Sequence, residues 1–184
     1  MVKSLFFIVI FIVLVGCAGQ PVDTALPPDW STSGKLSVRN AQQAQSARFR
    51  WQEWRSGSQT QYRVEVWGPL GQGRTVFAGS ADELKVTRGE RLIESGPALD
   101  IMLRHLGFQL PLAVLGGWLD GDPGPSAVVQ TLDASGRVAQ FDYANWQVGF
   151  SRYSAEIDGK PRRIRAEQGE YSVTVALARE IAQD

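Results

Sequence analysis

The 184-residue sequence predicts a mainly β fold with a few helices, arranged as an antiparallel meander in a sandwich or a barrel. Three observations lead to this fold class. After Trp30 most of the chain alternates apolar and polar residues with a period of two, which is typical of strands with one buried and one solvated face. Clusters of Gly, Asn, Asp and Ser separate these runs. One stretch, residues 96–107, has a helical period instead.

The alternating runs define six expected strands, each with its apolar residues two positions apart. In chain order these residues are Leu36 and Val38; Ala47, Phe49 and Trp51; Tyr62, Val64 and Val66; Leu84 and Val86; Trp146, Val148 and Phe150; Tyr171, Val173 and Val175. Turn-forming clusters lie at residues 40–42, 56–58, 133–136 and 158–159. Short strands joined by such turns indicate antiparallel pairing between chain neighbours.

A helix is expected over residues 97–106, in the stretch that breaks the period of two. Pro97 suits the first helical turn, and Gly107 suits the position after the C-terminal end. Four apolar residues fall on one helical face at the spacing i, i+3, i+4 and i+7, namely Leu99, Met102, Leu103 and Leu106.

A second short helix is expected from Pro111 to about residue 119. Its apolar side consists of Leu112, Leu115, Trp118 and Leu119. Gly116 and Gly117 lie inside it, so this helix is expected to be weak or broken. Apolar helices inserted into a β meander must cover an apolar surface, and the mouth or face of the sheet is the expected place.

The N-terminus predicts export and lipid attachment. Residues 5–15 are eleven consecutive apolar residues, about 16 Å as a helix and too short for a bilayer core of roughly 30 Å. They follow Lys3 and precede LVGC at 14–17, which resembles a bacterial lipobox. We therefore expect a lipoprotein signal peptide over 1–16, and a lipidated N-terminus and tether over 17–29. One β-barrel-like domain over 30–184 follows. Cys17 would carry the S-diacylglycerol and N-palmitoyl groups, and an ordinary signal peptide with a chance cysteine is the alternative.

Composition and motifs exclude several function classes. Nineteen basic and nineteen acidic residues balance, which argues against nucleic-acid binding. The single Cys and single His exclude a disulfide, a multi-cysteine metal site and most histidine-based catalysis. The chain contains neither a phosphate-binding Gly-rich loop nor a nucleophile elbow. His105 is expected to be a partly exposed helix residue, and Asp120 and Asp122 to be turn residues. We therefore expect no enzyme activity, no cofactor and no metal.

A loop between two expected strands, residues 66–73, has the sequence VWGPLGQG. Pro69 presets a turn, and the flanking glycines relieve backbone strain. Leu70 is therefore expected at the tip of the loop, with little around it to bury its side chain.

Seven segments in this order resemble one family over nearly the whole chain. They are the lipobox, GKLSV at 34–38, ARFRW at 47–51, GPLG at 68–71, LGFQLP at 106–111, GWLDG at 117–121 and NWQV at 145–148. The family is the outer-membrane lipoprotein receptor LolB of the bacterial lipoprotein-localisation pathway. The chain departs from the pattern at its C-terminus, which reads ALAREIAQD where relatives commonly end near a tryptophan. The pairing of the last strand is left open by this departure.

The resemblance implies an unclosed antiparallel β-barrel with a helical lid, LolA/LolB-like, around a hydrophobic cavity for acyl chains. Such a receptor accepts acylated lipoproteins from the periplasmic carrier LolA and inserts them into the inner leaflet of the outer membrane. The chain has no motif for ATP use, so passive transfer is expected. In the family a leucine on a protruding loop acts in insertion, and Leu70 matches it, flanked by Pro69 and Gly71. The candidate cavity residues are Phe49, Trp51, Val64, Val66, Leu99, Met102, Leu103, Leu106, Leu115, Trp118, Trp146, Val148 and Phe150.

The expected location is the outer membrane, with a lipid anchor and the body facing the periplasm. The expected partners are LolA, the lipoprotein cargo and outer-membrane lipids, with no nucleic acid, and the protein is expected to be a monomer. Two alternatives stay open. One is a lipid-anchored scaffold whose barrel is filled by side chains, and the other is a periplasmic protein that binds small lipids.

Overall fold

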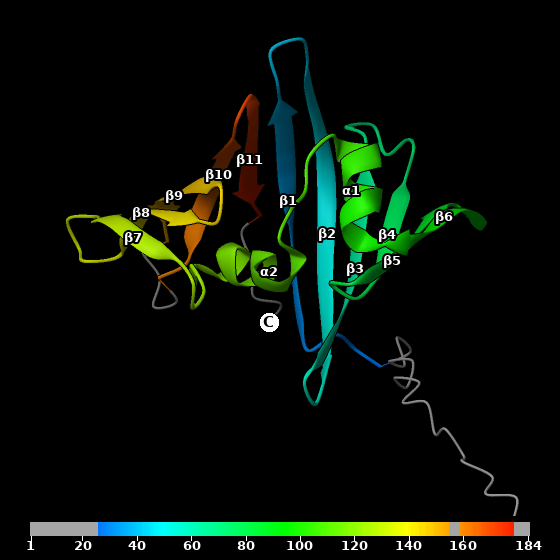
Figure 1. Ribbon diagram of the computed structural model, residues 1–184, viewed down its shortest axis with the longest axis horizontal. Helices are drawn as coiled ribbons and strands as arrows, with labels where there is room; N and C mark the ends of the chain where they lie inside the picture. Colours follow the sequence, from blue (N-terminus) through cyan, green and yellow to red (C-terminus); the bar gives the residue numbers. More distant parts are fainter. Residues whose placement is uncertain (1–25, 155–158, 179–184) are drawn as a thin grey trace, which may run out of the picture.

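The computed structural model describes residues 26–154 and 159–178, and the expected signal peptide, Cys17 and most of the tether lie outside them. Within the described residues, eleven strands form one antiparallel sheet (Figure 1). Their bounds are β1 Trp30–Arg39, β2 Ala44–Ser56, β3 Gln59–Trp67, β4 Thr75–Gly79, β5 Glu83–Arg88, β6 Arg91–Pro97, β7 Val128–Leu132, β8 Val138–Tyr143, β9 Trp146–Tyr153, β10 Pro161–Gln168 and β11 Tyr171–Leu177.

The strand order is β6-β5-β4-β3-β2-β1-β11-β10-β9-β8-β7. Its centre joins the two ends of the chain, because β1 pairs with β11 through Leu36 opposite Val175 and Val38 opposite Val173. The pairing of the last strand, left open by the sequence, is therefore with β1 on one side and β10 on the other. The edge strands β6 and β7 each have one neighbour among the described strands, so the sheet is unclosed, as the family resemblance implied.

All six strands expected from the alternating runs are present, as β1, β2, β3, β5, β9 and β11. Five further strands, β4, β6, β7, β8 and β10, were not predicted. Every residue of β7 is exposed, and its register with β8 is irregular, so burial imposes no alternation on its sequence. Strand β6 is likewise mostly exposed.

Both expected helices are present, α1 at Ala98–Leu106 and α2 at Leu112–Asp120. Gly107 follows α1 with a φ of 84°, and its N–H donates to the carbonyl oxygen of Leu103 at 3.0 Å. This left-handed cap ends the helix where the sequence predicted. Helix α2 runs through Gly116 and Gly117 without a break, so the expectation of a broken helix was wrong.

The two helices cover the inner face of the curved sheet (Figure 1). Helix α1 packs against β5 and β6, and α2 packs against β10. The two faces of the sheet therefore differ in burial. Its inner face contributes most of the buried apolar residues, including Phe49, Trp51 and Val86. Its outer face is exposed over the central strands.

Candidate functional site

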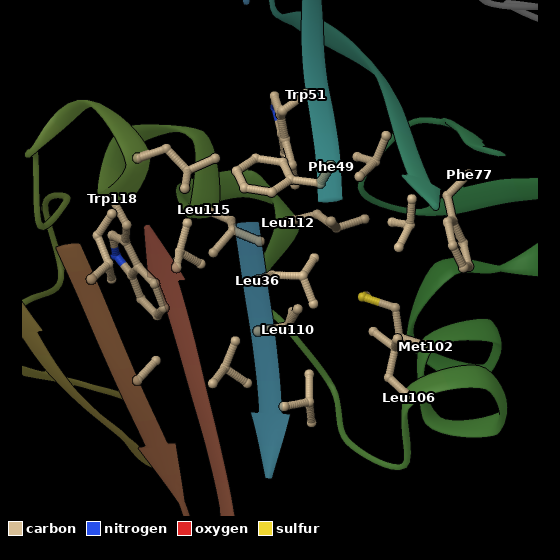
Figure 2. A pocket seen from close by; sticks show the side chains of 18 of the residues that line it. Leu36, Phe49, Trp51, Phe77, Met102, Leu106, Leu110, Leu112, Leu115 and Trp118 are labelled. Atoms are coloured by element: carbon tan, nitrogen blue, oxygen red, sulfur yellow. The ribbon is translucent and has the colours of Figure 1, made fainter. Parts of the chain in front are cut away.

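An apolar cavity of about 130 Å³ lies between the inner face of the sheet and the two helices (Figure 2). Side chains from β1 to β5, β10 and β11 form one wall. Helices α1 and α2 and the segment between them form the other. Every residue that lines the cavity is apolar. The arrangement can therefore bind hydrocarbon but offers no group for acid–base or nucleophilic chemistry.

Eight of the candidate cavity residues do line it, and these are Phe49, Trp51, Val64, Val66, Met102, Leu106, Leu115 and Trp118. Sequence reasoning missed twelve others, which are Leu36, Val38, Phe77, Leu84, Phe108, Leu110, Leu112, Leu119, Ile164, Ala166, Val173 and Val175. Seven of the twelve had been recognised as apolar strand or helix residues, so the missing information was which apolar faces meet. Ile164 and Ala166 lie on β10, where they alternate with Arg163 and Arg165. That period-two signal was present and could have been used.

The assignment of Leu99 and Leu103 to the cavity was wrong. Their exposed fractions are 48% and 50%, and they lie on the solvent side of α1. Ala98, Ile101 and Met102 face inward instead and are at most 3% exposed. Because α1 is apolar on two sides, the helical period alone did not show which side packs on the sheet.

Trp146, Val148 and Phe150 also do not line the cavity, although each is at most 4% exposed. The ring of Phe150 packs against Phe141 at a centroid distance of 5.0 Å, and Phe141 packs against Trp118 at 5.7 Å. These rings fill the space between β9 and the helices. Strand β9 therefore contributes to the packed core beside the cavity, and Trp118 is the member of this aromatic chain that reaches the cavity wall.

The two indole groups in the wall make their hydrogen bonds outside the cavity. Trp51 donates from Nε1 to Oε1 of Glu53 at 2.9 Å, and Trp118 donates from Nε1 to the carbonyl oxygen of Pro123 at 3.2 Å. Glu53 is 4% exposed and also accepts from Arg55 at 3.0 Å. The rings thus present carbon surface to the cavity, while their N–H groups stay paired.

Helix α2 rests on this buried carboxylate. A Cβ on Gly116 would lie 1.9 Å from Oε1 of Glu53, so a side chain is sterically excluded at this position. This close approach explains why a residue of low helical propensity stands in the middle of α2. Burial, and secondarily the charge of Glu53, raises the pKa of Tyr62, which keeps its phenol neutral beside the carboxylate.

The described residues show no other chemistry-bearing centre. Within 26–154 and 159–178 no group of His, Cys, Asp and Glu is placed to hold a metal ion. His105 lies with Nε2 3.0 Å from Glu94 on the protein surface. No helix in the same ranges is long and apolar enough to cross a membrane.

The predicted loop joins β3 and β4 and presents Leu70 with an exposed fraction of 82%. Two backbone hydrogen bonds define the loop: Gly68 donates to Gln72 at 2.9 Å, and Gly71 donates to Gly68 at 2.9 Å. Gly71 has a φ of 82°, a conformation that favours glycine. Pro69 precedes the tip, as predicted, and its ring holds the backbone in the turn. The tip is therefore a fixed turn that holds one apolar side chain in solvent.

The cavity is partly open to solvent. An apolar cavity of about 150 Å³ accommodates one benzene molecule, so about 130 Å³ is too small for an acyl chain. A longer ligand needs more space, which movement of α1 or α2 away from the inner face of the sheet would supply.

Comparisons of the sequence with a family model and with curated relatives agree on one family. The sequence model described as "LolB: Outer membrane lipoprotein LolB" matches residues 28–179. A relative with the name Outer-membrane lipoprotein LolB from Cellvibrio japonicus is 28% identical over 185 residues, which cover 89% of each chain. A second relative of that name, from Alkalilimnicola ehrlichii, is 32% identical over 154 residues, which cover 81% of this chain and 74% of the relative. A solved outer membrane lipoprotein-sorting protein domain from Vibrio parahaemolyticus overlays with a TM-score of 0.48 at 9% identity, covering 84% and 86% of the two chains.

Proposed function

The chain belongs to the outer-membrane lipoprotein LolB family, and we propose that it is a receptor that accepts acylated lipoproteins from the periplasmic carrier LolA and inserts them into the inner leaflet of the outer membrane. The observation that carries this proposal is the wholly apolar cavity between the sheet and the helices. The cargo would bind by its acyl chains, and α1 and α2 would act as a lid.

Burial of hydrocarbon supplies the driving force in this proposal. Each methylene removed from water contributes about 0.8 kcal/mol, so several acyl chains together contribute tens of kcal/mol. Release into water is therefore excluded, and the cargo must pass from carrier to cavity to bilayer with little exposure. Each step can be downhill if the cavity binds more tightly than the carrier and less tightly than the bilayer. No ATP is then required.

The location and the loop complete the proposal. Cys17 would carry the acyl groups that anchor the chain in the outer membrane, and residues 17–29 would link this anchor to a body that faces the periplasm. Leu70, held in solvent by the turn that includes Pro69 and Gly71, would enter the bilayer and lower the barrier to cargo release.

The test separates acceptance from delivery. A chain begun at Ala18 retains every described residue and lacks the anchor cysteine, so it reports on the body alone. We expect it to accept a labelled lipoprotein from LolA and to deliver it to liposomes. Leu70→Glu should leave acceptance unchanged and lower delivery at least tenfold, because a charged tip resists entry into the bilayer. Leu132→Glu is the matched control, since Leu132 is a 58% exposed leucine on β7. Equal delivery by the two variants would show that the loop is only a turn.

A second candidate function has one observation in its favour. The cavity of about 130 Å³ suits a small apolar molecule without any movement of the helices. A small-lipid binding protein would take up a free fatty acid or fluorescent apolar probe saturably and show no preference for acylated protein. A scaffold with a filled interior would give no saturable uptake. Competition between the probe and an acylated lipoprotein distinguishes the three.

A further inference from the structure

The outer face of the sheet is basic at the base of the loop that carries Leu70. Lys35 on β1 lies directly opposite Arg48 on β2, and Arg48 lies directly opposite Trp67, the last residue of β3. Directly opposed residues in an antiparallel sheet point to the same face. Lys35 and Arg48 are both exposed. A row of two cations and an indole therefore crosses three strands at the point where the loop begins.

Arg74, the residue before β4, extends this row. Its guanidinium lies over the ring of Trp67, with Cζ 5.2 Å from the ring centroid. It also forms an ion pair with Glu65 at 3.3 Å, and Arg63 approaches the same carboxylate at 3.0 Å. The Arg74 side chain is 61% exposed, whereas the Glu65 side chain is 10% exposed. The carboxylate is therefore covered by the cations, and it is the cations that meet solvent.

Little negative charge balances this surface. Along the described strands β11, β1, β2, β3 and β4 the acids are Glu53 and Glu65. Glu53 points inward against Gly116, so Glu65 alone serves the outer face. Lys35 and Arg48, like charges in direct opposition, lower the stability of the sheet instead of raising it. Their placement is therefore not accounted for by folding stability.

We propose that this basic surface, consisting of Lys35, Arg48 and Arg74 stacked on Trp67, binds the anionic headgroups of a phospholipid bilayer while Leu70 enters the hydrocarbon. The inference rests on the proposed function to the extent that the loop contacts a membrane. Basic side chains at a membrane surface bind anionic lipid, and indole rings locate at the headgroup level.

The dimensions fit this docking mode. Leu70 is three residues beyond Trp67, so its backbone lies at most about 10 Å from the basic row. Apolar groups of interfacial proteins enter the bilayer by about 5–10 Å below the headgroups. When Leu70 reaches the acyl region, the row of cations is at the depth of the phosphates. One loop can therefore make both contacts at once.

The test measures vesicle binding by the chain begun at Ala18, using phosphatidylethanolamine–phosphatidylcholine vesicles with and without about 30 mol% phosphatidylglycerol. We expect tighter binding to the anionic vesicles. Lys35→Gln and Arg48→Gln should each lower the partition coefficient about fivefold on anionic vesicles and leave it unchanged on neutral ones. Both variants should retain or slightly raise the melting temperature, because they remove a like-charge contact.

Lys85→Gln is the matched control. Lys85 is an exposed cation at the level of Gln52, four residues or about 13 Å along the strands from Arg48 and three strands or about 14 Å across the sheet. The Lys85→Gln variant should bind anionic vesicles as the unchanged chain does, because the separation of Lys85 from Arg48 exceeds the Debye length of about 8–10 Å. Equal losses for Lys85→Gln and Arg48→Gln would overturn the proposal, since net charge alone would then explain binding.

Two further results distinguish a membrane ligand from a protein partner, and headgroup binding from loop insertion. If Lys35→Gln and Arg48→Gln weaken complex formation with the carrier but not vesicle binding, the surface serves a protein partner and the proposal fails. Leu70→Glu on neutral vesicles reports the proposed loop insertion separately, because those vesicles give the cations no anionic ligand. An unaffected Leu70→Glu variant beside weakened Arg48→Gln would refute loop insertion and leave the basic surface supported.

Discussion

Gly116→Ala tests whether the buried Glu53 carboxylate determines how closely α2 approaches the sheet. The added Cβ would lie 1.9 Å from Oε1 of Glu53, and real contacts of this kind are at least about 3.0–3.4 Å. Something must therefore move by more than 1 Å. The carboxylate is not free to move cheaply, since it is 4% exposed and accepts from Trp51 at 2.9 Å and Arg55 at 3.0 Å.

Two opposing effects decide whether Gly116→Ala raises or lowers the free energy of unfolding. Alanine in a helix interior is more favourable than glycine by about 1 kcal/mol. If Glu53 swings aside, the Trp51 N–H loses a charged acceptor, which costs about 1.5–3 kcal/mol. If α2 lifts instead, overpacking costs about 1–3 kcal/mol. The net expectation is a destabilisation of up to about 2 kcal/mol, opposite in sign to an ordinary helical glycine-to-alanine change.

Urea unfolding of the chain begun at Ala18 measures this difference, and Gly117→Ala is the control in the same helix. A Cβ on Gly117 would lie 3.2 Å from the backbone oxygen of Asp122, a tight contact that small shifts relieve. We expect that variant to stay within about 1 kcal/mol of the unchanged chain. Gly116→Ala should also speed the uptake of an apolar probe, because α2 covers the cavity.

The reasoning is refuted if Gly116→Ala stabilises the protein as much as Gly117→Ala does. A double-mutant cycle sharpens the result. In a Glu53→Ala background the steric conflict is absent, so Gly116→Ala should there be neutral or stabilising. A destabilisation of the same size in both backgrounds would mean that Glu53 does not hold α2 at its distance.

Three further outcomes follow from the same structure. Met102→Ala should cost about 2–5 kcal/mol in urea unfolding, whereas Leu99→Gln should change stability by at most about 0.5 kcal/mol, since only Met102 is buried. The Arg137 side-chain hydrogen bond lowers the pKa of Asp133, so its stabilisation is present above the ordinary carboxyl range and lost as pH falls through the lowered value. Asp133→Asn should therefore reduce the loss of stability below pH about 4, measured by thermal unfolding against pH. Removing seven residues from the tether, 17–29, should leave acceptance of cargo intact and abolish delivery to the membrane that holds the anchor, measured in proteoliposomes.

The tether prediction follows from where the chain enters the sheet. Trp30 lies opposite Glu53, five residues along β2 from Arg48, while the loop that carries Leu70 leaves the sheet beside Arg48. The separation is about 17 Å along the strands plus at most about 10 Å of loop. Leu26 and Asp29 are hydrogen-bonded to Trp54 and Arg55 on β2, so the nine residues 17–25 supply the reach. Extended, nine residues reach about 30 Å and span this distance, whereas the two left after the deletion reach about 7 Å and do not.

The sequence predicted the strands where one face is buried and the other is solvated, because only there does burial impose a period of two. It failed at β7, which is exposed on both faces, and at β6, which is mostly exposed. It also failed to use the alternation of Ile164 and Ala166 with arginines in β10. The failures at β6 and β7 have a common physical cause: edge strands are held by backbone hydrogen bonds, which carry no side-chain pattern.

The cavity was predicted in kind but only partly in its residues. Leu99 and Met102 have the same hydrophobicity class and fit the same helical spacing, yet Leu99 is 48% exposed and Met102 is 3% exposed. Which side packs on the sheet depends on the crossing of the helix over β5, a tertiary property that local spacing does not contain. The exposed position of Leu70 was predicted correctly, since a turn with Pro69 and flanking glycines is a local property.

A cavity smaller than its proposed ligand and a passive route are compatible because the polar contacts on the outer sides of the helices are weak. The ion pairs of α1 with β6 join Glu94 to Arg104 and His105 at the surface, where such pairs contribute at most about 1 kcal/mol each. Helix α2 approaches the sheet over a glycine, and its contact with Glu53 is steric, with no hydrogen bond from the helix among those identified. Opening the lid also exposes buried side chains such as Met102 and Trp118, so many methylenes of an entering acyl chain, at about 0.8 kcal/mol each, are needed to offset its cost. The acyl chains of the proposed cargo would thus open the lid themselves, and the lid would close again when they leave for the bilayer.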